Sequence, residues 1–194
     1  MSSELTPSVV LEGYRLGIFP MADELGEIYW FSPDPRCVIE LERFRIPRSL
    51  RPVLNQRRFE TRVNTAFAEV IRACADRPEG TWISSEIIAV YSALHRAGYA
   101  HSVESWQDRR LAGGLYGVAL GGAFFGESMF YRVPDASKVA LVALVARLRQ
   151  RGFVLLDTQW STPHLQRFGA VEIPRREYLR RLDAALRLSC RFAD

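Results

Sequence analysis

The chain has 194 residues, of which 48% are hydrophobic and 25% are charged, and its formal net charge is +4. This size and composition predict one main soluble domain with a proper core and a small appendage. No apolar run approaches the roughly 20 residues that a membrane helix needs, and the N-terminus lacks the basic start of a secretory signal. We therefore expect a cytoplasmic protein with no membrane partner. The three cysteines (Cys37, Cys74 and Cys190) are too few and too far apart for a disulfide framework, so we expect them to pack in the core.

Residues 1–63 are predicted to form the small N-terminal α/β appendage. Thr6 and Pro7 begin a short helix that Gly17 ends. The aromatic, proline-rich stretch that follows, residues 18–36, is predicted to be an ordered loop. Apolar periodicity then predicts a strand over 37–41, a short helix over 47–54 and a strand over 59–63.

Residues 64–194 are predicted to form the main domain. Asn64 is expected to cap a helix that runs to Ala75, and Ser84 or Ser85 caps a second helix that Gly98 ends. The pattern then changes to strands joined by a polar turn and a Gly-Gly turn, over 100–106, 111–120 and 123–131. Three strands joined in this way predict an antiparallel meander.

A long helix is predicted to follow the meander. Asp135 caps it and Gly152 ends it, and its apolar residues cover more than one side, so we expect it to be buried against the sheet. A short strand over 153–156, a helix that begins at Thr162 and Pro163 and a final helix from Arg175 complete the chain. This order predicts an α+β fold, an acetyltransferase-like (GNAT-like) mixed sheet with helices on both faces.

Glu127 is the most unusual acidic residue in the sequence, because it lies inside the apolar strand predicted over 123–131. It could point outward on a wet face of that strand. However, strand alternation places Phe125, Glu127 and Met129 on one face, and the other face is also largely apolar. A carboxylate in such a place needs a partner or a chemical task. Soon after it comes Lys138, the only lysine among many arginines.

Arginines crowd the stretch 43–62, where Glu60 is the only opposing acid, and the four that we single out are Arg48, Arg51, Arg57 and Arg58. Such a stretch suits a phosphate backbone, although a solvated face in an arginine-rich chain is the alternative. A second arginine cluster, over 175–191, is interleaved with acids at helical spacing, so pairing within one helix explains much of it.

Several familiar sites are disfavoured by the sequence. Acyl-coenzyme A enzymes of the predicted fold hold pyrophosphate on a glycine-rich turn, but the matching turn, residues 132–138, has no glycine and places an acid at the helix start. The histidines lack metal-ligand spacing, so we expect no metal and no cofactor. His101, Ser102 and Glu104 resemble a hydrolase set only superficially, since neighbours on a strand point to opposite faces, and we expect supporting roles.

Seven ordered motifs together resemble the leucyl/phenylalanyl-tRNA-protein transferases. In order they are Trp-Phe-Ser-Pro-Asp-Pro-Arg at 30–36, Gly-Thr-Trp-Ile at 80–83, Ala-His-Ser-Val-Glu at 100–104, Gly-Gly-Leu-Tyr-Gly-Val at 113–118, Gly-Glu-Ser-Met-Phe at 126–130, Ala-Ser-Lys at 136–138 and Leu-Asp-Thr-Gln at 156–159. The resemblance implies transfer of leucine or phenylalanine from aminoacyl-tRNA to proteins that begin with arginine or lysine. The product would be marked for degradation by the N-end rule.

The resemblance also implies which residues carry the chemistry. Asp157 and Gln159 would orient or deprotonate the attacking amine, and their spacing of two places both on one face of an extended segment. Glu127 would either hold the cationic acceptor or tune Asp157, and the sequence leaves both roles open. Threonine at position 158, where many relatives have cysteine, favours direct attack without an acyl-enzyme.

The remaining predicted contacts concern the aminoacyl-tRNA. Seven residues are predicted to bind the substrate: Trp82 and Phe31 by stacking on the terminal adenosine, and Leu115, Met129, Phe130, Leu144 and Leu156 as an apolar pocket for the donor side chain. Because the sequence lacks the longer N-terminal leader of many relatives, we expect Arg48, Arg51, Arg57 and Arg58 to hold more of the tRNA. We expect a monomer. The rival functions are an acyl-CoA-dependent N-acetyltransferase, an aminoacyl-tRNA-dependent peptidoglycan-bridge transferase and a non-catalytic RNA-binding module.

Overall fold

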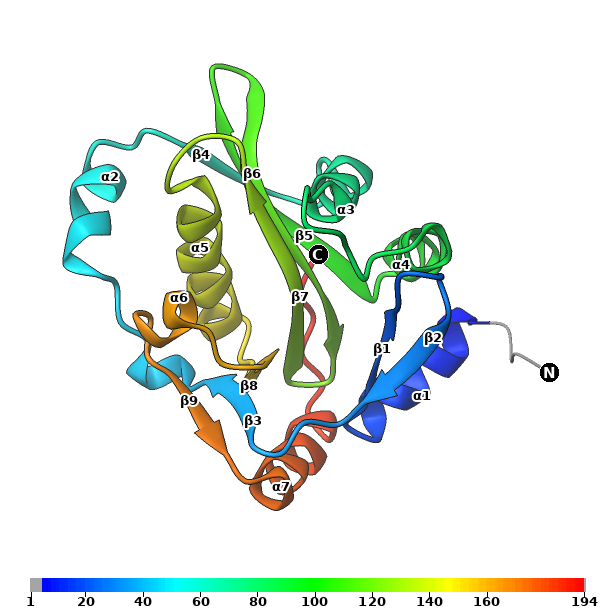
Figure 1. Ribbon diagram of the computed structural model, residues 1–194. Coiled ribbons are helices and arrows are strands. Elements are labelled where there is room, and N and C mark those ends of the chain that lie inside the picture. The colour runs from blue at the N-terminus through cyan, green and yellow to red at the C-terminus, as the bar shows by residue number, and fades with distance from the viewer. Residues whose placement is uncertain (1–4, 194) are drawn as a thin grey trace.

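A seven-stranded mixed sheet forms the centre of the protein in the computed structural model, which describes residues 5–193 (Figure 1). Its strand order is β4-β5-β6-β7-β8-β3-β9. The strands are β3 (Arg36–Ile39), β4 (Glu60–Val63), β5 (Ala100–Gln107), β6 (Arg110–Leu120), β7 (Ala123–Tyr131), β8 (Leu155–Gln159) and β9 (Ala170–Ile173). Neighbours are antiparallel except β7 and β8, which are parallel because helix α5 (Ala136–Gln150) carries the chain back across the sheet. The predicted mixed sheet and meander are thus confirmed.

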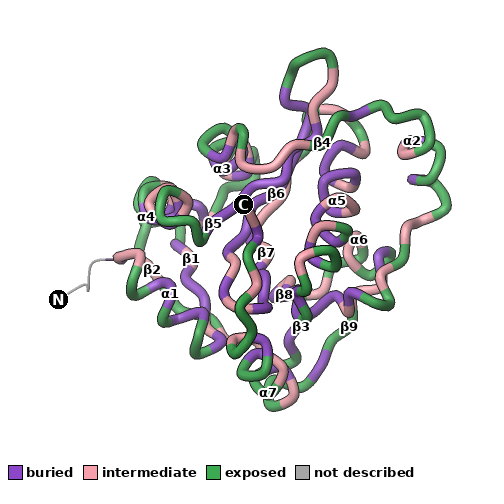
Figure 2. Tube along the Cα trace, turned by 180° about the vertical axis from the view of Figure 1, so that it is seen from behind, coloured by how far each residue is buried: buried purple, intermediate pink, exposed green. Residues whose placement is uncertain are grey.

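Two apolar clusters lie on the two faces of this sheet, and Figure 2 shows the buried strands between the helices. One cluster lies beneath α5 and the short helix α2 (Arg51–Asn55). The other lies beneath α1 (Pro7–Arg15), α3 (Phe67–Ala75), α4 (Ser85–Arg96) and α7 (Arg175–Leu186). We call these the α5 face and the α1 face. Helix α5 is buried on several sides, as its apolar pattern predicted. The short helix α6 (Pro163–Gln166) follows β8.

The stretch predicted as an ordered loop is instead mostly strand. β1 (Phe19–Ala22) pairs antiparallel with β2 (Ile28–Phe31) to form a small separate sheet, and β3 begins at Arg36. Proline at position 20 is tolerated because a two-stranded ribbon leaves one edge of each strand unpaired. The loop was therefore predicted wrongly because prolines usually interrupt strands. The edge strand β9 was also not predicted.

Strands β3 and β4 come from the predicted appendage, but both belong to the main sheet. β3 lies between β8 and β9, and all four of its residues are buried. The N-terminal residues therefore supply an inner strand next to β8. The boundary predicted at residue 63 stays a prediction.

The predicted cap at Asn64 is wrong. The Asn64 side chain accepts a hydrogen bond from the Ser102 N–H at 3.1 Å, on the neighbouring strand. Glu104, which is fully buried, instead accepts from the N–H groups of Thr65 and Ala66 at the start of α3. A carboxylate from another strand thus satisfies the exposed N–H groups of this helix, which is a supporting role.

Asp135 occupies the predicted position before α5, but its side chain does not cap the helix. The residue has φ +72°, and its carboxylate accepts from the Lys138 Nζ at 2.6 Å. The only lysine of the chain therefore neutralises the acid at the start of α5. This local pair accounts for the position of Lys138 in the fold.

Candidate active site

The polar centre of the molecule lies where strands β7 and β8 part. The two strands pair over only three residues each, and the last pair is Phe125 with Asp157. Directly beyond it, the Gln159 Nε2 donates to the Glu127 Oε1 at 3.2 Å. The carboxyl ends of parallel strands are where open sheets place ligands, so this point is the natural candidate site.

A β-bulge gives Glu127 its direction. Tyr116 of β6 faces Ser128, and the next residue, Gly117, faces Gly126, so Glu127 is an extra residue without a cross-strand partner. A bulge of this kind re-aims a side chain. It directs Glu127 to the α1 face, whereas Met129 packs in the cluster on the α5 face. The prediction that Glu127 and Met129 share one face is therefore wrong.

Two buried tyrosines support the Glu127 carboxylate. The Tyr14 hydroxyl of α1 donates to Glu127 Oε1 at 2.6 Å. Because its single proton is used there, Tyr14 accepts in turn from the Tyr91 hydroxyl of α4. The second carboxylate oxygen, Oε2, is buried and has no hydrogen-bond partner among the described residues. One oxygen is thus held in place, and the other keeps its hydrogen-bonding capacity unused among the described residues.

Burial controls the proton affinity of Glu127. With only 9% of the residue exposed, loss of hydration raises the pKa of Glu127 to about 7, and the charge of Asp157 acts in the same direction. The hydrogen bonds from Tyr14 and Gln159 and the charge of Arg36 act against this rise. Near neutral pH the group can therefore both accept and release a proton.

The Asp157 carboxylate is fully occupied. Arg36 binds it with two hydrogen bonds of 2.9 and 2.6 Å, the Tyr178 hydroxyl donates at 2.8 Å and the Gln159 N–H donates at 2.9 Å. All four of its lone-pair positions are taken, and the residue is completely buried. Asp157 is therefore built to hold its neighbours in place, and it has no free oxygen with which to take a proton.

Arg36 is the partner that makes this buried charge tolerable. Its guanidinium also donates to the Gly17 carbonyl and lies over the rings of Phe19 and Tyr178. Burial pulls the pKa of Arg36 down, but the hydrogen bonds and charge of Asp157 raise it above its usual value. The pair is a bidentate ion pair, and the guanidinium makes further hydrogen bonds to the Gly17 carbonyl and the Tyr178 hydroxyl, which is the kind of support a buried pair requires.

Gln159 links the two acids. Its main-chain N–H binds Asp157 while its side-chain amide binds Glu127, and its φ of +66° turns the chain at the end of β8. The amide NH₂ carries two hydrogens, and the hydrogen bond to Glu127 uses one of them. The structure thus brings together the three predicted catalytic residues.

The predicted donor pocket is brought together in part. Leu115, Met129, Leu144 and Leu156 all belong to the cluster on the α5 face, where Leu115 and Met129 are cross-strand partners. Phe130 packs with the opposite cluster, on the α1 face. These four side chains lie on the opposite face of the sheet from the Glu127 carboxylate, which contacts Tyr14 on the α1 face.

The two aromatic residues predicted to stack on adenosine lie apart. The Trp82 carbonyl accepts from the Ala22 N–H, at one end of the β1–β2 sheet. Phe31 lies at the other end, opposite Phe19 and next to the ring of Trp160. Three residues of strand, about 10 Å, separate the two ends. Both rings are at least partly exposed, so each is available to a ligand.

The predicted tRNA contacts Arg48, Arg51, Arg57 and Arg58 flank α2 and are all exposed. None of them forms an ion pair with another residue in the described part of the chain. They lie toward the α5 side of the sheet, and Figure 1 shows α2 at the upper left. This placement suits a surface for a large polyanion.

Four supporting residues were missed by the sequence analysis: Tyr14, Arg36, Tyr91 and Tyr178. Arg36 gave a usable signal, since it is a charged residue in an otherwise apolar strand, as Glu127 is. The tyrosines gave none, because a tyrosine on the inner face of a helix is ordinary core.

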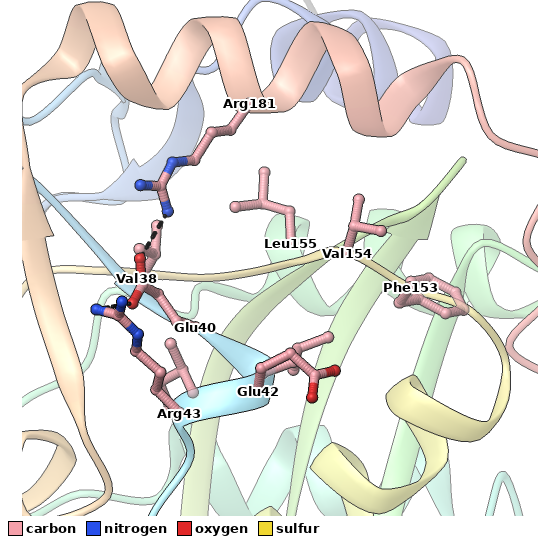
Figure 3. Close-up of a pocket in the computed structure, with 10 residues that line it drawn as sticks. Val38, Glu40, Glu42, Arg43, Phe153, Val154, Leu155 and Arg181 are labelled. Carbon is pink, nitrogen blue, oxygen red and sulfur yellow. Dashed lines mark hydrogen bonds and ion pairs between the residues drawn. The ribbon is translucent and has the colours of Figure 1, made fainter.

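A hollow of about 320 Å³ lies away from this centre (Figure 3). Its wall includes Glu40, which forms ion pairs with Arg43 and Arg181, and its floor includes Leu155. Leu155 begins β8 and Gln159 ends it, so about 13 Å of strand separates the hollow from the candidate site. The hollow is therefore distinct from the site.

Known proteins match this chain along nearly its whole length. The family described as "Leucyl/phenylalanyl-tRNA protein transferase" matches residues 38–183, and its N-terminal domain matches residues 3–34. A leucyl/phenylalanyl-tRNA–protein transferase of Gloeobacter violaceus is 61% identical over 189 residues, covering 97% of each chain. One of Rubrobacter xylanophilus is 59% identical and covers 97% of this chain and 99% of its own.

Among solved structures, L-PGS from Bacillus licheniformis aligns with a TM-score of 0.44 at 13% identity, covering 80% of this chain and 51% of that one, a likeness too weak to support an argument. No helix in residues 5–193 has the length and apolar character needed to cross a membrane. The family matches confirm the resemblance drawn from the seven motifs. The chain belongs to the leucyl/phenylalanyl-tRNA protein transferase family.

Proposed function

We propose that this protein transfers leucine or phenylalanine from aminoacyl-tRNA to the α-amino group of proteins that begin with arginine or lysine. The observation that carries the proposal is the Glu127–Gln159 pair, where a buried carboxylate keeps one oxygen free at the parting of β7 and β8. Proteins with such a new N-terminus would be degraded under the N-end rule. Because its donor is an aminoacyl-tRNA, the protein would act in the cytoplasm. It would act as a monomer.

The reaction needs little base strength. An aminoacyl ester is already activated, and an α-ammonium group has a pKa of about 7.7 to 8.0. We assign the free Glu127 Oε2 as the acceptor of the amine proton, since the pKa of Glu127 is about 7. The amine nitrogen forms a bond to the ester carbon, the bond from that carbon to the ribose oxygen breaks, and the proton passes through Glu127 to this leaving oxygen.

Gln159 is assigned to the carbonyl oxygen. Its second amide hydrogen is available to the negative charge that develops there during attack. Asp157 acts as a positioning residue, because it holds the Gln159 main chain and the Arg36 side chain rather than a substrate. An ionised Glu127 would also leave the site with net negative charge, which favours a cationic acceptor.

The grouped side chains Leu115, Met129, Leu144 and Leu156 are proposed to receive the donor side chain. An apolar pocket with flexible members accepts leucine and phenylalanine and rejects charge. The proposal also includes contacts with the aminoacyl-tRNA. Trp82 and Phe31 stack on the terminal adenosine, Phe130 contacts the donor, and the α2 arginines contact the tRNA. The acetyltransferase-like fold is also part of the proposal, and the early parting of β7 and β8 supports it.

One set of incubations tests this function. Radiolabelled Leu-tRNA or acetyl-coenzyme A is offered with an Arg-initiated peptide, an otherwise identical Ala-initiated peptide or a cell-wall precursor. We expect label only in the Arg-initiated peptide and only from Leu-tRNA. Transfer from acetyl-coenzyme A, or labelling of the cell-wall precursor, would establish a rival function. Binding of Leu-tRNA without any transfer would establish the non-catalytic RNA-binding module.

A further inference from the structure

An open hollow of about 800 Å³ lies beside the turn that joins β5 to β6. The turn projects from one end of the molecule, at the top of Figure 1, where β7 also ends. Three arginines line the hollow, Arg109 from the turn, Arg110 from the start of β6 and Arg132 from the segment after β7. The acids among its lining residues are Glu69 of α3 and Asp108.

The arginines of the hollow are available to a ligand. Arg109 and Arg110 are exposed, and within residues 5–193 neither forms an ion pair with a carboxylate. Arg132 pairs with Glu69 at 2.7 Å, but about half of each side chain is exposed. An exposed pair of this kind contributes little, so a stronger anion can take the place of Glu69.

Trp106 adds a donor that lacks an acceptor. Its ring lines the hollow, and the guanidinium of Arg62 lies over it at 4.7 Å. The indole Nε1 is shielded from solvent, yet it has no hydrogen-bond partner among the described residues. A buried N–H group without an acceptor is unfavourable, and an acceptor oxygen supplied by a ligand would relieve that cost.

A cationic path connects the hollow with the candidate active site. Arg132 lies five residues after Glu127 along β7, about 17 Å when extended. Between them, Arg77 donates to the Ser128 hydroxyl and the Met129 carbonyl, and no acid in the described part of the chain pairs with it. Positive groups therefore follow β7 from the reacting residues to the turn.

We propose that this hollow, together with Arg77, binds the phosphate groups of the donor RNA strand whose end carries the amino acid. The inference rests on the proposed function. A stacked strand carries one phosphate per 3.4 Å, so 17 Å corresponds to about five nucleotides. The hollow thus contacts the RNA near its reacting end. The surface is separate from the arginines of α2, which lie toward the other face of the sheet.

Direct binding of Leu-tRNA, measured without any acceptor, tests the proposal. The variant is Arg109→Gln with Arg110→Gln, and the matched control is Arg180→Gln on α7 with Arg187→Gln directly after it, which removes the same charge at the opposite end of the molecule (Figure 1). Each lost phosphate contact lowers the slope of log affinity against log salt by roughly 0.7 to 0.9. We expect the hairpin variant to lose about 1.5 in slope and roughly ten- to hundredfold in affinity near 50 mM salt.

One further donor and one further acceptor locate the effect. Transfer from leucine esterified to adenosine alone should be unchanged in the hairpin variant, because that donor has no phosphates. An unchanged salt slope, or an equal loss with both donors, overturns the proposal. A loss that appears only with a long protein acceptor would assign the hollow to the acceptor protein instead. If the wild type binds the RNA but forms no peptide bond, the proposed transfer fails, while the salt slopes still decide the role of the hollow.

Discussion

Replacing Glu127 with glutamine should change how the stability of the protein depends on pH. Burial raises the pKa of Glu127 from its usual 4.5 to about 7. Between these two values the unfolded chain ionises while the folded protein keeps the proton. The protonated Glu127 therefore contributes its full stabilisation of the folded protein below pH 4.5. This contribution is lost as the pH rises, and the loss is complete once the pH passes about 7. Glutamine has the same shape but does not titrate, so the variant escapes this loss.

The difference between the two pKa values, 7 minus 4.5, is about 2.5 units. At 1.36 kcal/mol per unit it corresponds to roughly 3 kcal/mol of unfolding free energy. That is a large share of the 5–15 kcal/mol that typically stabilises a domain. Urea unfolding of both proteins at several pH values between 4.5 and 8.5 measures it. Other acids titrate alike in both proteins, so the difference between them isolates Glu127.

We expect the stability of Glu127→Gln relative to wild type to rise by roughly 3 kcal/mol between pH 4.5 and 7 and then to stay level. A difference that is constant over the whole range would show that the folded protein does not hold a proton on Glu127. The assignment of this residue as a base that works near neutral pH would then lose its physical ground.

Three other substitutions probe the surroundings of Glu127. Asp157→Asn leaves the buried guanidinium of Arg36 without its anion, so urea unfolding should show a loss of roughly 3 to 5 kcal/mol, and single-turnover transfer should slow strongly while tRNA binding holds. An unaffected transfer rate would refute the positioning role. Tyr14→Phe removes a donor that lowers the pKa of Glu127, so the rise of the transfer rate with pH should move to higher pH; an unmoved profile counts against this contact. Leu144→Ala should cost about 2 to 5 kcal/mol and shift donor preference from leucine toward phenylalanine in a competition assay, and an unchanged preference would remove Leu144 from the pocket.

The larger elements could be predicted from the sequence because their patterns are strong. Alternation and the Gly-Gly turn define the meander, and the wide apolar surface of residues 136–150 defines the buried helix. The small β1–β2 sheet was missed because Pro20 within it and the prolines that follow it are typical of loops. The edge strand β9 was missed because two of its four residues are exposed, so no apolar alternation marks it.

From the sequence, only those site residues could be predicted whose type is unusual for their position. Glu127 and Asp157 stand out as acids within apolar strands, and the structure joins them through Gln159. The bulge that turns Glu127 away from Met129 leaves no sequence signal, because one extra residue reverses the face without changing the pattern. The support from Tyr14 and Tyr91 depends on packing between distant helices, which periodicity does not reveal.

The pH dependence of single-turnover transfer from Leu-tRNA to an Arg-initiated peptide tests the central role of Glu127 most directly. Two groups should titrate in the wild type, Glu127 near pH 7 and the acceptor amine near pH 8. In Glu127→Gln the transfer rate should fall, and its pH profile should show only the titration of the acceptor amine. A variant that keeps both steps and the wild-type rate would show that the proton leaves the amine by another route.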